Sequence, residues 1–482
     1  MLYHQSNRGG RIERIPKRIW GLGLLVLIYL FIAYAIPRPA AIQPEGWRLF
    51  ALFSATVAGL IFQPISGGAL VLIAVVFSSL VGGLNIKQSL DGYSDPTNWL
   101  VLAAFLLSRS LINTGLARRI ALFFVRLFGK TSLGVSYALC LSDMVLATII
   151  PSNGARSGGV ILPIVRGVAE LYGSKPGVTA PLIGAFLMTS VYQGICISSA
   201  MFLTGQASNP LAAQMASKIS GIQIDWFSWF SAGLVPGLLS MLAVPWLVSK
   251  IYKPGITKTP EAAEFARQEL LKMGTLSSHE RIMSAVFVCV CTAWSTTSIH
   301  HLDVAVPALL GAIALLVTGV LTWEDVRKEE AAWDMFIWYG GLLNLARALN
   351  GTGIPTEFAK AVGASLSGLN WYPLLLIALL IYFFAHYAFA SITAHMLAMF
   401  PAFVAVLIAQ GAPPGLTAFG FAIFTSLSAG LTNYGTTPAP MFFAQGYVEM
   451  KDWWRIGFCC ALVNLTIWST IGFAWWKWLG IW

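Results

Sequence analysis

Two short polar segments interrupt long apolar stretches of this chain, and they match each other in residue type. Residues 152–156 read Ser-Asn-Gly-Ala-Arg, and residues 391–395, 239 positions after the first, read Ser-Ile-Thr-Ala-His. Ser152 and Ser391 can each cap the helix that follows, which points free amide groups and the positive end of the helix dipole into one pocket. The two segments are therefore expected to be the tips of one anion-binding site.

Cationic side chains favour the same chemistry. Arg156 and His395 each lie four residues after a capping serine, about one helical turn along on the same face. They would place one permanent and one titratable positive charge near the pocket, which suits carboxylate groups. Two alternatives stay open: Arg156 can be a structural partner of Asp143, and His395 can be a hydrogen-bonded core histidine beside His386.

A second pair of polar breaks follows the tips by about 40–50 residues. Residues 204–210 read Thr-Gly-Gln-Ala-Ser-Asn-Pro, and residues 432–438 read Thr-Asn-Tyr-Gly-Thr-Thr-Pro. Glycine and proline interrupt a helix and free backbone groups, and the polar side chains add donors and acceptors at the same depth. The predicted substrate-binding residues are Ser152, Asn153, Gly154, Ser391, Thr393, Ser208, Asn209, Thr436, Thr437 and Pro438, with Arg156 and His395 compensating charge.

The composition indicates a polytopic membrane protein. Of 482 residues, 57% are hydrophobic and only 10% are charged, whereas an ordinary globular domain is about 25% charged. The net charge of +10 comes mostly from short basic segments between apolar stretches, so it fits the positive-inside rule and not a nucleic-acid partner. The six cysteines lie in apolar runs without ligand spacing, so neither a disulfide framework nor a metal site is expected.

Eleven apolar stretches approach the length that a bilayer requires. They are 19–36, 47–64, 67–84, 97–114, 178–203, 229–251, 282–299, 304–321, 333–349, 416–431 and 456–478. The basic residues in 8–18 predict a cytoplasmic N-terminus, and the odd number of crossings then places the C-terminus outside the cytoplasm. We expect a multi-pass protein of the cell inner membrane, embedded in the lipid bilayer.

Two further apolar stretches, 132–172 and 372–409, carry a polar tip at their middle. As re-entrant hairpins they would hold each tip near the midplane, which is allowed only where the tip is buried in protein or lines a cavity. Plain helix pairs with exposed loops remain the alternative. The fold class is therefore all-α, with about eleven transmembrane helices plus two re-entrant hairpins.

An internal repeat supports the hairpins. The pattern Leu-x-Arg-x-Leu followed by Thr-Gly occurs around Arg109 and again around Arg347, at an offset of 238. The two copies are five crossings apart, so they run in opposite directions, as in many secondary transporters. Both arginines are expected to brace the hairpins or snorkel, and not to bind substrate. The expected organisation is a basic head with scaffold helices (1–90), a first inverted repeat (91–252), a cytoplasmic connector (253–281) and a second inverted repeat (282–482).

The tips resemble those of a known family. Residues 151–156, Pro-Ser-Asn-Gly-Ala-Arg, resemble the first tip of the divalent anion/sodium symporter family, and 389–395, 115–122 and 446–455 are similar as well. The likeness covers nearly the whole chain and is strongest to the bacterial citrate/succinate and tartrate/succinate antiporters and the plastid 2-oxoglutarate/malate translocators. It implies a homodimer in which a transport domain moves like an elevator against a scaffold. It also implies that the serine, asparagine and threonine positions of the tips hold carboxylates, and sodium ions in sodium-coupled members.

This chain departs from the family pattern at two positions. Gly154 replaces a threonine and Ile392 replaces an asparagine of sodium-coupled relatives, and both losses weaken a sodium site more than an anion site. Arg156 and His395 stand beside the sodium-binding positions, where a fixed cation would replace the ion. The resemblance thus implies sodium-independent exchange of di- or tricarboxylates such as succinate, malate, citrate, tartrate or 2-oxoglutarate. A sodium-coupled dicarboxylate or sulfate symporter of the same fold is the alternative.

Enzymatic chemistry is not indicated. His300 and His301 lie next to Asp303 without further ligands, and the chain contains no His-Glu-x-x-His motif. We therefore expect a protein that is not an enzyme and that needs no cofactor, with sodium as the one doubtful ion.

Overall fold

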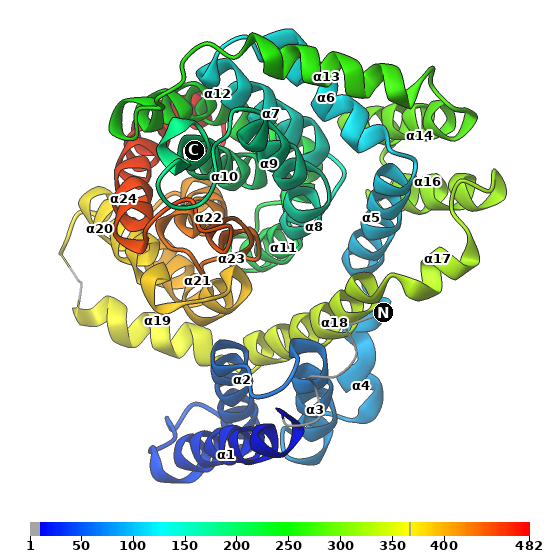
Figure 1. Cartoon of the computed structure of the whole chain (residues 1–482). Coiled ribbons are helices and arrows are strands. Elements are labelled where there is room, and N and C mark those ends of the chain that lie inside the picture. The colour runs from blue at the N-terminus through cyan, green and yellow to red at the C-terminus, as the bar shows by residue number, and fades with distance from the viewer. Residues whose placement is uncertain (1–9, 366–367) are drawn as a thin grey trace.

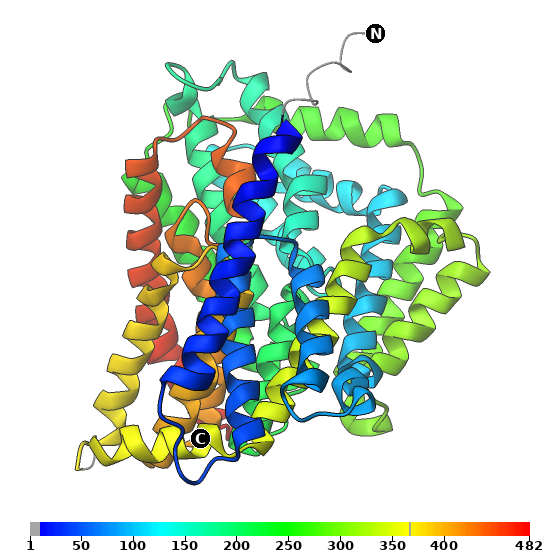
Figure 2. The same cartoon turned by 90° about the horizontal axis from the view of Figure 1, so that it is seen from below.

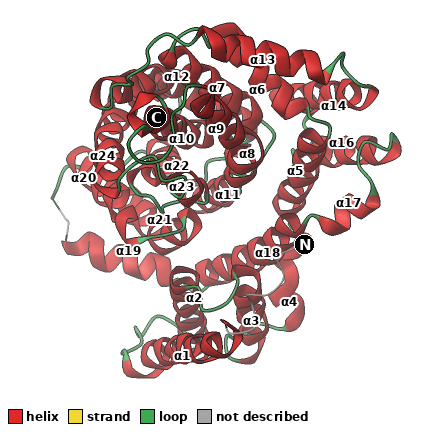
Figure 3. Ribbon diagram, in the orientation of Figure 1, coloured by secondary structure: helices red, strands yellow, loops and turns green. Residues whose placement is uncertain are grey.

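The computed structural model describes residues 10–365 and 368–482, so Arg8 of the basic head lies outside the described residues. Every regular element in the described part is helical, as Figure 3 shows, and the predicted all-α class is confirmed. Seven described helices are long and apolar enough to cross a membrane, and the bent pair Pro96–Asn113 and Leu116–Phe128, at 63°, adds a further candidate. The protein is therefore polytopic, and the count of eleven spans stays a prediction.

The first hairpin consists of α7 (Ser132–Ala147), a short loop, and then α8 (Asn153–Arg156), η3 (Ser157–Ile161) and α9 (Leu162–Leu171). Ser152 caps the second arm, and its Oγ accepts a hydrogen bond from the Ala155 amide at 3.1 Å. Capping satisfies one of the amide groups that a helix start leaves without a partner. The predicted cap is confirmed.

The second hairpin consists of α20 (Trp371–Ala385), η6 (His386–Ala388) and α21 (Ile392–Ala409). Ser391 caps α21, and its Oγ accepts from the Ala394 amide at 3.3 Å. Both tips thus begin a helix with the same serine geometry, although the second arm of the first hairpin contains a π-helical turn and the second does not.

Two helices are broken where the sequence predicts it. The chain leaves α10 (Gly184–Met201) through η5 (Leu203–Gly205) before α11 (Ser208–Ser220), and it leaves α22 (Pro414–Leu427) through η7 (Ser428–Leu431) before α23 (Pro438–Phe443). Every residue of α10 is buried, as is every residue of α22 after Pro414, and the two helices pack against each other inside a ring of other helices (Figure 1). The breaks therefore lie in the protein interior.

The helix order of the first half recurs in the second. Five successive helices of the first half match five of the second half in order. The first series is α2 (Pro44–Phe62), α3 (Gly67–Leu80), α4 (Ile86–Leu90), α5 (Pro96–Asn113) and α6 (Leu116–Phe128). The second series is α14 (Ser278–Ser295), α16 (Ala305–Val317), α17 (Trp323–Lys328), α18 (Glu330–Gly351) and α19 (Ile354–Ser365), with the short α15 (Thr297–His300) inserted after α14. The shared helix order extends back to Pro44, and the start of the first repeat at 91 stays a prediction. The helices before α5 and α18 repeat in length and order but not in residue type, so a comparison of residue identities does not detect them.

Contacts between equivalent positions join the two halves. The Asn98 side chain donates to the Phe336 carbonyl at 3.3 Å, and these residues are 238 positions apart, which is the offset of the repeat. Arg109 lies 3.5 Å from Glu329, and Arg347 contacts Asp95. Each arginine therefore pairs with a carboxylate of the other half and braces the helices around α5 and α18.

The remaining helices surround this arrangement. Helix α1 (Gly10–Leu30), extended by η1 (Phe31–Ala35), packs on α2 at the periphery, and α12 (Trp226–Ile251) packs against α24 (Met450–Ile467), which η8 (Trp468–Gly472) and α25 (Phe473–Trp478) continue. The connector forms α13 (Pro260–Met273), which packs on α6. Helices α13 and α19 lie at opposite ends of the protein (Figure 2).

A glycine contact between α18 and the turn before α5 tests this packing. An added Cβ at Gly92 would overlap the backbone carbonyl of Gly340, which cannot move aside as a flexible side chain can. We expect Gly92→Ala to destabilise the fold by about 1–3 kcal/mol through overpacking, measured as a lower melting temperature in detergent. Gly23→Ala is the matched control because nothing lies within 4 Å of its added Cβ; equal melting temperatures for the two variants would contradict the packing.

Candidate functional site

A small cavity contains the second tip. Its volume is about 190 Å³, and it is lined by Ser391 and Thr393 together with Gly59, Leu60, Gln63, Ile65, Gly67, Trp338 and Leu342 of α2, α3, α18 and the loop between α2 and α3. Pockets for drug-sized ligands are usually about 300–1,000 Å³, so this cavity suits a small metabolite. It offers two hydroxyls, one amide and the start of α21.

Gln63 is a lining residue that the sequence analysis missed. It adopts a left-handed backbone conformation, with φ of 47°, directly after α2 ends. Gln63 and Pro64 are the last two residues of the apolar stretch 47–64. The stretch was assigned as a plain membrane span, and a polar residue at the end of a span does not by itself predict a lining role.

The first tip contacts the second broken helix. The Asn153 side chain donates to Thr436 Oγ1 at 3.0 Å. An added Cβ at Gly154 would lie 2.8 Å from Thr437 Cγ2, so glycine allows the tip to approach this break closely. Asn153, Gly154 and Thr436 are buried, while Thr437 is exposed. These predicted site residues are thus brought together, although they do not line the cavity at the second tip.

Asn209 belongs to a closed hydrogen-bond network. Its Nδ2 donates to the carbonyls of Ser199 at 2.7 Å and Phe202 at 2.8 Å, and its Oδ1 accepts from Gln206 at 3.0 Å and Ser426 at 2.9 Å. These bonds use both donors and both acceptor positions of the amide. The structure therefore gives Asn209 the task of satisfying carbonyls that the break leaves free, which differs from the expected ligand role. Ser208 and Pro438 are buried at the starts of α11 and α23.

Arg156 is fully buried and ion-paired. Its Nε lies 2.9 Å from Asp143 Oδ1, and both side chains are 0% exposed. Its Nη1 donates to the carbonyls of Ile150 at 2.7 Å and Gly205 at 2.6 Å, and Nη2 donates to Ser199 Oγ at 3.0 Å. A buried charge requires a partner because its desolvation is costly.

This geometry corrects the expected role of Arg156. The side chain does not present an uncompensated charge to an anion, because Asp143 neutralises it and no face of the guanidinium is open. Arg156 is a structural partner of Asp143, which is the alternative that the sequence left open. The pair could not be chosen from the sequence, since 13 positions separate the two residues and only the hairpin fold brings them together.

The second hairpin carries a buried histidine pair. His386 Nε2 lies 2.9 Å from the Gly435 carbonyl, so this nitrogen donates, and His386 Nδ1 lies 3.1 Å from His395 Nδ1. His395 stacks on Tyr382 with ring centroids 4.3 Å apart. Both histidines are 0% exposed, so His395 does not reach the cavity that Ser391 and Thr393 line.

The two halves share one feature at this depth. Gly205 and Gly435 each lie three residues before the second part of a broken helix, and each carbonyl accepts a hydrogen bond from a basic side chain of a hairpin. Arg156 donates to the Gly205 carbonyl. His386 donates to the Gly435 carbonyl, and His395, which was predicted to compensate charge at the site, does not. Because Thr436 binds Asn153, the second break contacts both hairpins.

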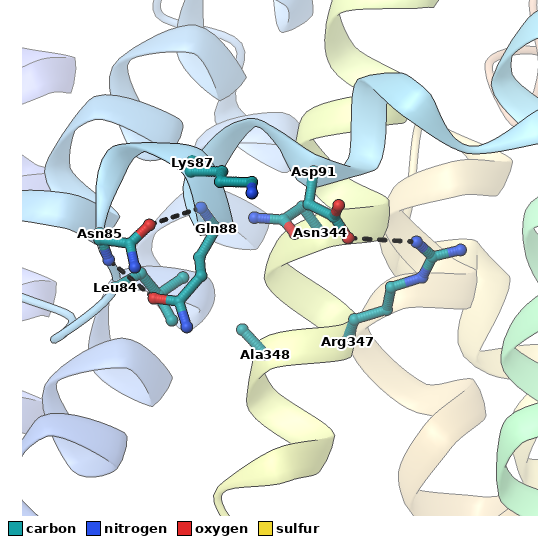
Figure 4. A pocket seen from close by; sticks show the side chains of 8 residues that line it. All are labelled: Leu84, Asn85, Lys87, Gln88, Asp91, Asn344, Arg347 and Ala348. Atoms are coloured by element: carbon teal, nitrogen blue, oxygen red, sulfur yellow. Dashed lines mark hydrogen bonds and ion pairs between the residues drawn. The ribbon is translucent and has the colours of Figure 1, made fainter.

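A larger cleft of about 570 Å³ lies between α4 and α18 (Figure 4). Arg347, which lines this cleft, forms ion pairs with Asp91 and Asp95. The dashed line in Figure 4 marks the pair with Asp91. No tip or break residue lines this cleft. We therefore place the candidate site at the tips and not there.

Paired hairpins beside paired broken helices, in an all-helical membrane protein, define a transporter and not an enzyme. Among the residues that the structure describes, no group of histidine, cysteine and carboxylate side chains could hold a metal ion. The family model described as the sodium:sulfate symporter transmembrane region matches residues 16–482. The chain belongs to this family, the divalent anion/sodium symporters that its tips resemble.

Several relatives match over most of their length. The putative malate transporter YflS of Bacillus subtilis is 43% identical over 460 residues, which cover 95% of this chain and 96% of the relative. The chloroplastic dicarboxylate transporter 1 of Arabidopsis thaliana is 40% identical over 454 residues, covering 94% and 82%. The crystal structure of the YdaH transporter of Alcanivorax borkumensis matches with a TM-score of 0.53 at 14% identity, covering 97% and 98% of the chains, and supports the fold alone.

The Arg156–Asp143 pair yields a stability prediction. Arg156→Met leaves a buried carboxylate without its partner, so we expect a loss of about 3–5 kcal/mol and a lower melting temperature in detergent. The double variant Arg156→Met with Asp143→Leu should recover a large part of that loss, because no unpaired charge remains.

Arg267→Met provides the control, since its pair with Glu264 is exposed on α13 and solvent-exposed ion pairs contribute little to stability. A melting temperature of the double variant below that of Arg156→Met would contradict the stabilising role of the ion pair.

Proposed function

We propose that this protein carries small di- or tricarboxylates across a membrane and exchanges one for another without sodium. The relatives named as malate and dicarboxylate transporters support the substrate class. The small cavity at the second tip supports it too, because carboxylate oxygens accept hydrogen bonds and the cavity supplies the hydroxyls of Ser391 and Thr393 and the amide of Gln63. The N-terminal end of α21, 18 residues long, adds a favourable dipole for an anion.

The contacts of Arg156 carry the proposal that sodium is not needed. Unwound backbone carbonyls beside broken helices are what transporters use to coordinate sodium. Here the Arg156 guanidinium occupies such oxygens, the carbonyls of Ile150 and Gly205 and the hydroxyl of Ser199. A covalently attached cation holds these ligands permanently, so an ion has no vacancy to fill.

The second half supports the same reading. The Gly435 carbonyl, equivalent to that of Gly205, accepts from His386. Ile392 brings no amide to this tip and is itself buried. At both breaks a basic side chain thus holds a backbone carbonyl of the kind that a hard cation requires as a ligand.

Exchange follows from the cost of moving an empty site. The cavity at the second tip exposes the start of α21, two hydroxyls and the amide of Gln63, and burying such groups without a partner costs about 1–3 kcal/mol each. A bound carboxylate satisfies them, so the loaded site crosses an apolar barrier more readily than the empty one. We propose that the hairpins and broken helices, α7–α11 and α20–α23, cross as one body against α2–α5 and α14–α18, in a homodimer of the inner membrane with its N-terminus in the cytoplasm.

The sodium-coupled alternative rests on the family description, which names a sodium:sulfate symporter. Sealed vesicles containing the purified protein separate the two. We expect labelled malate or succinate to enter only when the vesicles are preloaded with a carboxylate, at the same rate in sodium and in potassium. Uptake into empty vesicles driven by a sodium gradient would establish symport instead. Vesicles preloaded with sulfate in place of a carboxylate test whether the protein also carries sulfate.

A single hydroxyl in the cavity tests the substrate contact. Thr393→Val removes the hydroxyl and keeps the side-chain shape, and the loss of one hydrogen bond costs about 0.5–1.5 kcal/mol. We expect the KM for dicarboxylate exchange to rise about 2- to 10-fold, with unchanged melting temperature. Thr466→Val is the control, since this exposed hydroxyl bonds only the Leu462 carbonyl of its own helix; equal KM values for the two variants would contradict the contact.

A further inference from the structure

A cavity of about 340 Å³ lies at the end of α12, away from both tips. It is formed where α12 ends beside the beginning of α7, and it is lined by Thr131, Ser132, Leu133, Ser249, Lys250, Lys253, Pro254 and Thr257. The lining contains two basic side chains, four hydroxyls and no carboxylate. This composition selects an anion.

The two lysines are available for a ligand. Among residues 10–365 and 368–482, no carboxylate lies within ion-pair distance of Lys250 or Lys253. Lys250 Nζ lies over the Trp246 ring, 5.7 Å from the ring centroid. The hydroxyls of Ser132 and Ser249 already donate to the carbonyls of Ile256 and Trp246, so the two lysines are the main donors left in the cavity. Lysine ammonium groups bind phosphate as point charges.

The backbone around the cavity is fixed by hydrogen bonds. The Ser132 amide donates to the Thr257 carbonyl at 3.1 Å, the Thr259 amide donates to the Lys130 carbonyl at 2.9 Å, and the Gly255 amide donates to the Pro181 carbonyl at 3.0 Å. The segment after α12 is thereby held against the start of α7. The cavity is a built feature of the fold.

Its position points to a lipid and not to a soluble ion. Helix α12 is long and apolar enough to cross the membrane, and Leu242 and Trp246, on its last turns before Lys250, are 60% and 52% exposed. Exposed tryptophan followed by lysine marks the interface between hydrocarbon and headgroups. Acyl chains alongside Leu242 and Trp246 would bring a lipid phosphate to the level of Lys250 and Lys253.

We propose that this cavity binds the phosphate headgroup of an anionic phospholipid, with its acyl chains along the outer face of α12. Attraction of anionic lipid to a basic site near the surface is about 1 kcal/mol per lysine, so removing both lysines should lower the apparent affinity about 10- to 30-fold.

Native mass spectrometry of the full-length protein in detergent, titrated with phosphatidylglycerol or phosphatidylcholine, tests the proposal. The wild-type protein should retain one phosphatidylglycerol more tightly than any phosphatidylcholine, and K250Q with K253Q should lose that preference. K250R with K253R should keep it. K175Q should keep it as well, since Lys175 is exposed and does not line the cavity.

Equal binding of the two lipids by the wild-type protein would overturn the proposal. So would retention of the preference by K250Q with K253Q. Displacement of the lipid by inorganic phosphate or malate at millimolar concentration would also overturn it, because the cavity would then be a site for soluble anions.

Discussion

The buried ion pair between Arg156 and Asp143 is the interaction on which the interior of this protein depends. A guanidinium and a carboxylate cannot leave water without each other, and here the guanidinium also satisfies carbonyls at Ile150 and Gly205 that the tip loop and the first break leave free. One side chain therefore ties the first arm of a hairpin, its tip and a broken helix together. These segments are held as one body, which is what carrying a substrate between two surfaces requires.

In the second half, a histidine takes the place of the arginine in satisfying the carbonyl at the break. His386 takes the Gly435 carbonyl, and the neighbouring Thr436 accepts from Asn153 of the first hairpin. The second break thus connects both hairpins. Outside this body, Arg109 and Arg347 pair with carboxylates of the opposite half, so the surrounding helices are also joined across the repeat. Contacts between the two halves thus join the helices in two places, one around α10 and α22 and one around α5 and α18.

Sequence reasoning recovered the features that depend on local chemistry. The serine caps and the two breaks follow from residue types and spacing, and the structure has them where the sequence places them. It did not recover which polar groups are satisfied inside the protein. Asn209 was predicted to bind substrate, but all its hydrogen-bonding positions are used by the break itself. Gln63 was missed because its contact with the cavity arises from helix packing, which no residue pattern encodes.

We propose that the Arg156 guanidinium permanently occupies the position that a sodium ion would take. Equilibrium binding of radioactive sodium to the purified protein, with and without saturating dicarboxylate, measures whether that position is filled. We expect no saturable sodium binding in either condition, because Arg156 holds the oxygens at Ile150, Ser199 and Gly205. Saturable binding that the dicarboxylate strengthens would contradict the claim and would show that sodium enters the site together with the substrate.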